Sequence, residues 1–217
     1  MSTGLIIIGG GEHARVVAEA ARSQPDLLRL EGFVDPESCA SFERMVQIPR
    51  LGSDQYLIER AKRESGCWAV LGVGAVRVAN HRRRVVESYQ GTELRWVQVL
   101  HSAAWISPTA TIQEGVVVLA GAVVNSGAFL GAHCVVNTGA IIEHDVRVDP
   151  FAIVSPGATV GGGAVLQEDC FIGLGARIRD HVTVGLGATV GMGAAVVKDV
   201  CPGQVVVGVP AEVMKTR

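Results

Sequence analysis

A six-residue repeat governs the second half of this chain. Stepping by six from Ile106 meets an aliphatic residue at sixteen consecutive places, the last of them Val196. Val, Ile and Leu make up 61 of the 217 residues, so chance agreement at all sixteen places has a probability on the order of one in a billion. A second column, four places after the first and running from Ala110 to Val200, contains only Ala, Val and Cys.

A period of six fits neither an α-helix, which needs apolar spacing near 3.6, nor an ordinary half-buried strand, which alternates with period 2. It is typical of short strands joined by turns, each strand placing one branched aliphatic and one small residue inward. Three strands complete a triangular coil of about 18 residues, and successive coils stack as parallel strands about 4.8 Å apart. The interior is too narrow for rings, and the aromatic residues of this stretch avoid both columns: Phe129, Phe151 and Phe171. Glycines are expected where the turns need conformations that other residues resist: Gly121, Gly127, Gly139, Gly157, Gly163, Gly175, Gly187 and Gly193.

The composition changes near residue 100. Most aromatic residues and the charged run His81–Arg84 precede residue 106, whereas the remainder is rich in Gly, Ala and Val. We therefore predict a domain over residues 1–100 and a second over 101–217. The run His81–Arg84 is expected to form a solvated helix face.

The first domain alternates strand and helix patterns. A buried strand ends at Ile8, a glycine-rich turn follows, and residues Ala14–Ser23 are expected to be helical. Further strands are expected over Leu30–Val34 and Trp68–Val73. Such alternation predicts a small α/β unit of the Rossmann-like type with a parallel sheet.

Composition excludes several classes of protein. The net charge of −2 provides no basic field for nucleic acid. No apolar run approaches the length of a membrane span, and Leu5–Ile8 is too short for a secretory signal, so a cytoplasmic location is expected. The five cysteines have no CxxC spacing. Cys134 and Cys170 lie two coils apart, about 10 Å, which is beyond disulfide reach, and both are expected to be packing residues.

The glycine-rich turn contains Gly9, Gly10 and Gly11, with Ala14 completing an approximate dinucleotide fingerprint and Asp35 about twenty residues further on. Backbone N–H groups at such a turn can hold a phosphate, while a tight turn that serves only chain geometry is the alternative. We favour a nucleotide-diphosphate role. A redox nicotinamide role is disfavoured because no domain for hydride transfer follows.

The chain resembles the sugar O- and N-acyltransferases related to sialic acid O-acetyltransferase, a family that includes nucleotide-amino-sugar N-acetyltransferases. The motifs that carry the resemblance are IGGGEHARVV, GFVD, LHSAAWISP, VNTGAIIEHD, VSPGATVGG and GVPA, in family order. The resemblance implies a left-handed parallel β-helix, although the general rule for parallel crossovers favours the opposite hand. It also implies a homotrimer that binds acetyl-CoA as co-substrate between neighbouring prisms. The N-terminal domain would then hold the nucleotide of the acceptor.

His144 is the candidate general base. It lies outside both inward columns, so it should reach the surface, and Asp145 is placed to orient its imidazole. The resemblance implies the same two roles. It also implies that Asn137 lies near the acceptor and that the backbone N–H of Gly162 faces the thioester carbonyl.

The donor-binding residues implied by the resemblance include one departure. Many family members carry a second histidine nine places after the first, where this chain has Ile153. Gly208 and Pro210 belong to the closing motif, near the adenine end of CoA. Lys198, Lys215 and Arg217 are surface charges that could assist the phosphates.

Three other histidines leave alternatives open. His13, in the glycine-rich turn, is either an acceptor contact or part of the domain core. His133 and His181 raise the alternative of a trimeric zinc carbonic anhydrase, but their spacing from His144 lacks the tight histidine pair that such a site needs. We therefore predict no metal.

The sequence thus predicts an acetyl-CoA-dependent N-acetyltransferase acting on the amino group of a nucleotide-linked deoxysugar. O-acetylation of a sugar hydroxyl, which uses the same base and donor, is one alternative. A non-catalytic nucleotide-sugar-binding trimer is the other.

Overall fold

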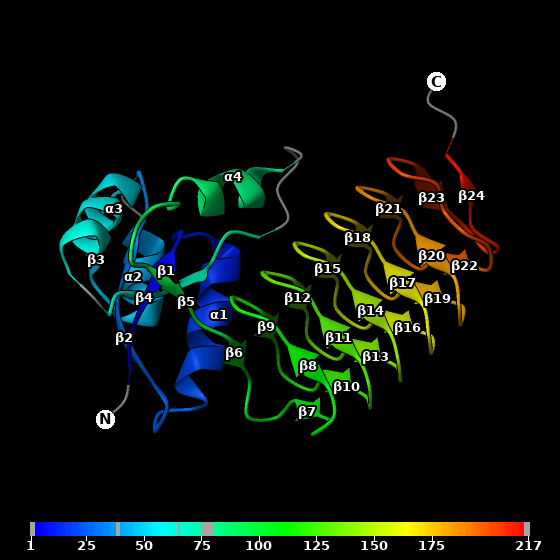
Figure 1. Ribbon diagram of the computed structural model, residues 1–217, viewed down its shortest axis with the longest axis horizontal. Coiled ribbons are helices and arrows are strands. Elements are labelled where there is room, and N and C mark those ends of the chain that lie inside the picture. The colour runs from blue at the N-terminus through cyan, green and yellow to red at the C-terminus, as the bar shows by residue number, and fades with distance from the viewer. Residues whose placement is uncertain (1–2, 38–39, 65, 75–79, 215–217) are drawn as a thin grey trace. The chain divides into compact units, whose positions relative to one another are not determined.

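The computed structural model describes residues 3–37, 40–64, 66–74 and 80–214. The chain divides into two compact units, Met1–Ser102 and Ala103–Arg217, whose elements are labelled in Figure 1. Among the described residues, no helix is long and apolar enough to cross a membrane.

The first unit is a parallel sheet with helices in its connections. Its five strands lie in the order β3-β2-β1-β4-β5, and all four pairings are parallel. The central strand carries Leu5, Ile6, Ile7 and Ile8, each at most 1% exposed, as a strand buried on both faces requires. The elements are β1 Thr3–Ile8, α1 Glu12–Arg22, β2 Leu28–Val34, α2 Ala40–Val46, β3 Arg50–Gly52, α3 Asp54–Arg63, β4 Trp68–Leu71, α4 His81–Glu87, β5 Arg95–Trp96 and β6 Val99–Leu100.

The predicted α/β unit is confirmed, with differences at the boundaries. Helix α1 begins at Glu12, directly after the last glycine of the turn, rather than at Ala14. The strand expected to reach Val73 ends at Leu71. The prediction of a solvated face over the charged run is wrong for Arg82, which is 5% exposed and donates Nε–H to the Val73 carbonyl at 3.0 Å.

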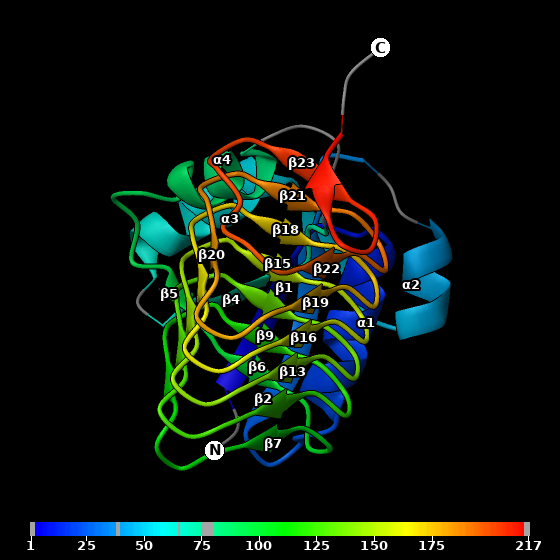
Figure 2. The ribbon, with the colours of Figure 1, turned by 90° about the vertical axis from the view of Figure 1, so that its right-hand side faces the viewer.

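The second unit is a stack of triangular coils (Figures 1 and 2). Its strands are two residues long except β23, which has three. Strands β7, β10, β13, β16, β19 and β22 form one face, and β8, β11, β14, β17 and β20 form the next; the third contains β9, β12, β15, β18, β21, β23 and β24. We call these the β13, β14 and β15 faces. Partners in neighbouring coils are 18 residues apart, as in Ile142 with Val160. The bounds are β7 Trp105–Ile106, β8 Thr111–Ile112, β9 Val117–Val118, β10 Val123–Val124, β11 Phe129–Leu130, β12 Val135–Val136, β13 Ile141–Ile142, β14 Arg147–Val148, β15 Ile153–Val154, β16 Thr159–Val160, β17 Val165–Leu166, β18 Phe171–Ile172, β19 Arg177–Ile178, β20 Thr183–Val184, β21 Thr189–Val190, β22 Ala195–Val196, β23 Val205–Val207 and β24 Glu212–Val213.

Both predicted inward columns line the interior of this prism. Every aliphatic position from Val118 to Val196 is buried, and only Ile106 and Ile112 of the first coil are half-buried. The small-residue column is buried from Val116 onward. Cys134 and Cys170 lie in it as buried thiols, in keeping with packing roles.

One position in every turn has a left-handed backbone. From Gly115 to Gly193, each sixth residue has a φ between 55° and 70°. Glycine occupies most of these places because it has no Cβ to clash. The exceptions place a side chain at the strained position: His133, Asp145, Phe151, Asp169 and His181. Two of them, Asp145 and His181, lie on one corner of the prism.

The end of the chain leaves the repeat after Val200, which still bridges to Val184. Strand β23 pairs in parallel with β21, and β24 returns antiparallel to it. The Val209–Pro210 peptide between them is cis. Lys215 and Arg217 lie outside the described residues.

Candidate active site

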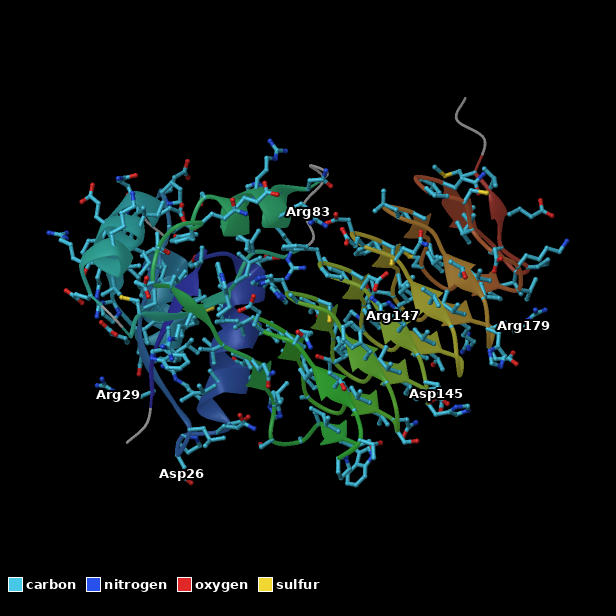
Figure 3. The ribbon with its side chains drawn as sticks, in the orientation of Figure 1. Asp26, Arg29, Arg83, Asp145, Arg147 and Arg179 are labelled. Atoms are coloured by element: carbon cyan, nitrogen blue, oxygen red, sulfur yellow. The ribbon has the colours of Figure 1, made fainter. Side chains whose placement is uncertain are left out.

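The corner that joins the β13 face to the β14 face carries the predicted base. We call it the His144 corner; its turns are residues 125–128, 143–146, 161–164 and 179–182. The side chains of His144 and Asp145 are 60% and 73% exposed, and His144 Nδ1 lies 3.0 Å from Asp145 Oδ2. Figure 3 shows Asp145 and Arg179 pointing outward along this edge of the coils. The imidazole therefore faces the surface, as the repeat predicts.

The carboxylate sets the protonation chemistry of this imidazole. The hydrogen bond to Asp145 raises the pKa of His144 above its ordinary value, and the negative charges of Asp145 and Glu143 act in the same direction. When Nδ1 holds its proton toward Asp145, the lone pair of the neutral ring is on Nε2. Nε2 is then the atom that can accept a proton from a substrate.

Glu143 is itself held by a residue that the sequence analysis did not single out. Asn125, one coil earlier, donates Nδ2–H to Glu143 Oε2 at 3.0 Å. The signal was present in the repeat, because Asn125 precedes Glu143 by 18 residues and therefore stacks beneath it. The pair fixes the acidic side of the His144 corner.

Gly162, one coil after His144, leaves a notch that the imidazole occupies. A Cβ at Gly162 would lie 2.7 Å from both Cε1 and Nε2 of His144, so only a glycine allows the ring this position. Among the described residues, the Gly162 N–H has no hydrogen-bond acceptor. An unused backbone donor thus lies beside the basic nitrogen, which is the arrangement an oxyanion site needs.

Asn137 lies on a different corner of the same prism. It follows β12, at the opposite end of β13 from His144, and its Nδ2 donates to the Val154 carbonyl at 3.1 Å. Ile153 is half-buried on the β15 face, paired with Val135 and Phe171. One prism therefore does not bring either residue to the imidazole.

The closing motif is held against the last coil. Ala195 N–H donates to the Gly208 carbonyl at 3.0 Å, and Ala211 N–H donates to the Ala195 carbonyl at 2.8 Å. Val209 is 78% exposed, next to the exposed Pro210. The motif presents an open surface beyond the coils that carry His144.

In the first unit, the carboxylate of Asp35 organises the glycine-rich turn. Its Oδ2 accepts the Gly10 N–H at 2.8 Å, and its Oδ1 accepts the Glu37 N–H at 2.9 Å. Gly9 has φ +102° and donates to the Val34 carbonyl. The Gly10 amide is thus already engaged, whereas a Cβ at Gly11 would meet nothing within 4 Å. The open part of the turn is the start of α1.

His13 packs beside this turn as a neutral ring. Burial, and then the charge of Arg82, lower the pKa of His13 to about 4. Its Nε2 is buried and has no hydrogen-bond partner among the described residues. A Cβ added at Gly74 would lie 3.0 Å from the Cβ of His13, so the ring packs against this glycine.

The remaining histidines do not assemble a metal site within the described chain. No group of three or more His, Cys, Asp or Glu side chains is arranged there to hold a metal ion. His133 is 3% exposed and stacks on Phe151 with ring centroids 5.1 Å apart. His181 lies instead on the His144 corner.

Comparison with known proteins identifies the class. Residues 4–89 match the model of the PglD N-terminal domain. A histidine-to-alanine variant of GDP-perosamine N-acetyltransferase from Caulobacter crescentus, in complex with CoA and GDP-perosamine, is 29% identical over 98% of this chain and 97% of its own, with a TM-score of 0.87. The acetyltransferase domain of PglB from Neisseria gonorrhoeae FA1090, in complex with acetyl coenzyme A, is 33% identical over 99% of this chain and 100% of its own, with a TM-score of 0.86. Comparison with curated protein sequences gave no match.

The prism is accordingly a left-handed parallel β-helix of the acyltransferase type, and the predicted fold class is confirmed. The chain belongs to the hexapeptide-repeat family of nucleotide-amino-sugar N-acetyltransferases. It is an acetyl-CoA-dependent sugar acetyltransferase, with acetyl-CoA as co-substrate. The sequence prediction of enzyme class and donor is confirmed, and the alternative of a non-catalytic binding trimer is set aside.

Proposed function

We propose that this enzyme transfers the acetyl group of acetyl-CoA to the amino group of a nucleotide-linked amino deoxysugar, with His144 as general base. The observation that carries the proposal is the geometry of one imidazole. Its Nδ1 faces Asp145 at 3.0 Å, and its Nε2 lies over the notch at Gly162. A base, its orienting carboxylate and an unused N–H donor therefore occupy one exposed corner.

The chemistry follows from these positions. The amine attacks the thioester carbonyl carbon, and His144 Nε2 takes the proton that the nitrogen loses as the C–N bond forms. Asp145 stabilises the imidazolium that results. The Gly162 N–H donates to the carbonyl oxygen as negative charge develops on it. The C–S bond then breaks, and CoA departs as its thiolate, which becomes the thiol when it takes up a proton.

Two features favour an amine over a hydroxyl acceptor. The solved relative at 29% identity is named as an N-acetyltransferase and holds GDP-perosamine. In addition, Glu143 and Asp145 flank the base, and two carboxylates attract the ammonium form of an amino sugar more strongly than a neutral hydroxyl. The bound ammonium group must release one proton to water to give the free amine that attacks. O-acetylation of a sugar hydroxyl is the second candidate, because the same base and donor would serve it.

The nucleotide of the acceptor is assigned to the glycine-rich turn of the first unit, with Gly9, Gly10, Gly11, His13 and Asp35 as the proposed contact region. Within it, the Asp35 carboxylate already accepts two backbone N–H groups. We therefore assign Asp35 the role of shaping the turn, and the N–H groups at the start of α1 the role of meeting phosphate oxygens.

We further propose that the working enzyme is a homotrimer. Asn137 and Ile153 lie away from the His144 corner of their own prism. A neighbouring prism could bring such residues to the corner, and the donor would then lie in the groove between prisms, reaching Gly208 and Pro210 at its far end.

The test is His144→Ala, assayed with acetyl-CoA and a panel of UDP-, GDP- and dTDP-linked amino sugars and their hydroxyl counterparts. Loss of the base should lower kcat by a factor on the order of 10² to 10⁴ while calorimetry still detects acetyl-CoA binding. His81→Ala, in α4, is the matched control and should keep full turnover. Undiminished turnover by His144→Ala would disprove the role of this residue, and exclusive use of hydroxyl acceptors would replace N- by O-acetylation.

A further inference from the structure

A second imidazole lies on the His144 corner, and the proposed reaction has not used it. His181 follows Asp180 in the turn 179–182, two coils after His144. It is exposed and has a left-handed backbone, with φ 55°. The coil between the two histidines contributes Gly162 and Gly163.

The two rings lean toward that middle coil from opposite sides. His144 lies against Gly162 from the coil before, with Cε1 and Nε2 each 2.7 Å from the place of a Cβ. His181 lies against Gly163 from the coil after, with Nδ1 and Cε1 at 2.5 and 2.6 Å from the place of a Cβ. Side chains at 162 and 163 would displace both rings, so the glycine pair makes one notch with an imidazole on each side.

Backbone hydrogen bonds fix this arrangement. Gly163 N–H donates to the His144 carbonyl at 2.9 Å, and His181 N–H donates to the Gly162 carbonyl at 3.0 Å. The coils of the two histidines are therefore about 10 Å apart, twice the spacing of stacked strands. A small group lying over the notch has an imidazole on each side of it.

Other titratable groups surround His181. Asp180, beside it in the turn, has Oδ1 3.9 Å from Arg179 Nε. In the next coil, Asp199 Oδ1 accepts the Thr183 N–H at 2.8 Å, and Lys198 is exposed. Among the described residues, the side-chain atoms nearest the places of a Cβ at Gly162 and at Gly163 belong to His144 and His181, respectively.

We propose that His181 is the general acid that protonates the departing sulfur of CoA; this rests on the proposed function. With the thioester oxygen on the Gly162 N–H and the amine on the His144 side, the sulfur lies toward the next coil, in the direction of Gly208. As the C–N bond forms, the amine proton passes to His144 Nε2. As the C–S bond breaks, His181 imidazolium delivers its proton to the sulfur, and both rings recover their starting states by exchange with water.

The test compares His181→Asn and His181→Gly with Asp169→Asn. Asparagine and glycine both accept a left-handed backbone, so the turn is retained; Asp169 has the same backbone conformation on another corner. The expected result concerns turnover rather than donor binding. We expect His181→Asn to lower kcat with acetyl-CoA about 10- to 100-fold without raising the KM for acetyl-CoA. Added imidazole should restore turnover to His181→Gly. Asp169→Asn should behave as wild type.

Unchanged kcat, an effect on KM alone, or failure of imidazole to restore His181→Gly would overturn the proposal. His144→Ala, measured in parallel, separates the two assignments: an inactive His144→Ala beside a fully active His181→Asn rejects only the acid. A further experiment omits the acceptor sugar and follows the histidine side chains by NMR. Acetyl-CoA should shift the imidazole resonances of His181 and leave those of His81 in place, and an unshifted His181 would also overturn the assignment.

Discussion

Asp145 has a backbone conformation that most residues with a Cβ avoid, with φ 58°. Aspartate is among the few side chains that tolerate it. The turn directs the carboxylate beside the preceding imidazole. A Cβ added at Gly127 would clash with Asp145 Oδ1. The pairing of the proposed base with its carboxylate therefore depends on three residues: a histidine, an aspartate at the left-handed position, and a glycine one coil earlier.

Asp145→Asn tests the pairing through its pH dependence. Asp145 raises the pKa of His144, and a general base works only when neutral, so we expect activity to fall as pH falls through that pKa. Removing the carboxylate lowers the pKa of His144 and should move the acidic limb of the kcat/KM profile to lower pH. The plateau should also fall at least about tenfold because the ring loses its orientation. A limb that stays in place would contradict the assignment.

Gly162→Ala tests the notch. The backbone there is not left-handed, so alanine should fold, but its Cβ would lie 2.7 Å from His144 Nε2. We expect kcat to fall by roughly tenfold or more, with the melting temperature nearly unchanged. Full activity in this variant would show that the imidazole does not work from the position it occupies here.

At the scale of elements, two-residue strands are stable only because each one pairs with the equivalent strands of the neighbouring coils. A single strand contributes one inward aliphatic side chain and pairs with the coils 18 residues before and after it, as Leu166 does with Val148 and Val184. This stacking places the chemistry-bearing residues of one corner in register. Asn125 under Glu143 and His181 above Gly163 follow from it.

Leu166→Ala tests the inward column, with Val165→Ala on the outer side of the same strand as control. Leu166 is fully buried, whereas Val165 is half-buried. The cavity left by Leu166 should cost about 2–5 kcal/mol of unfolding free energy, and the control less than about 1 kcal/mol. Chemical denaturation measures both, and equal losses would argue against a packed interior.

At the scale of the whole molecule, the proposed homotrimer has a direct measurement. Sedimentation or light scattering should give a mass three times that of the 22.7 kDa chain. The physical reason is that the predicted site residues Asn137 and Ile153 lie away from the His144 corner within one prism. A chain that remains monomeric while active would refute both the trimer and the shared site.

The repeat by itself determined the coils, both inward columns and the exposure of His144, because a period of six with 18 residues per coil places every side chain by its number. The motifs indicated the enzyme class. Tertiary structure alone decided the environments of the titratable groups in the first unit. Arg82 is buried, the Asp35 carboxylate accepts hydrogen bonds from two backbone amides, and burial lowers the pKa of His13 so that its ring is neutral. There the contacts join segments far apart in sequence with no fixed period, so spacing does not reveal them. The convergence of His144 and His181 on one glycine pair also needed coordinates, because the direction in which a ring leans is set by packing between coils.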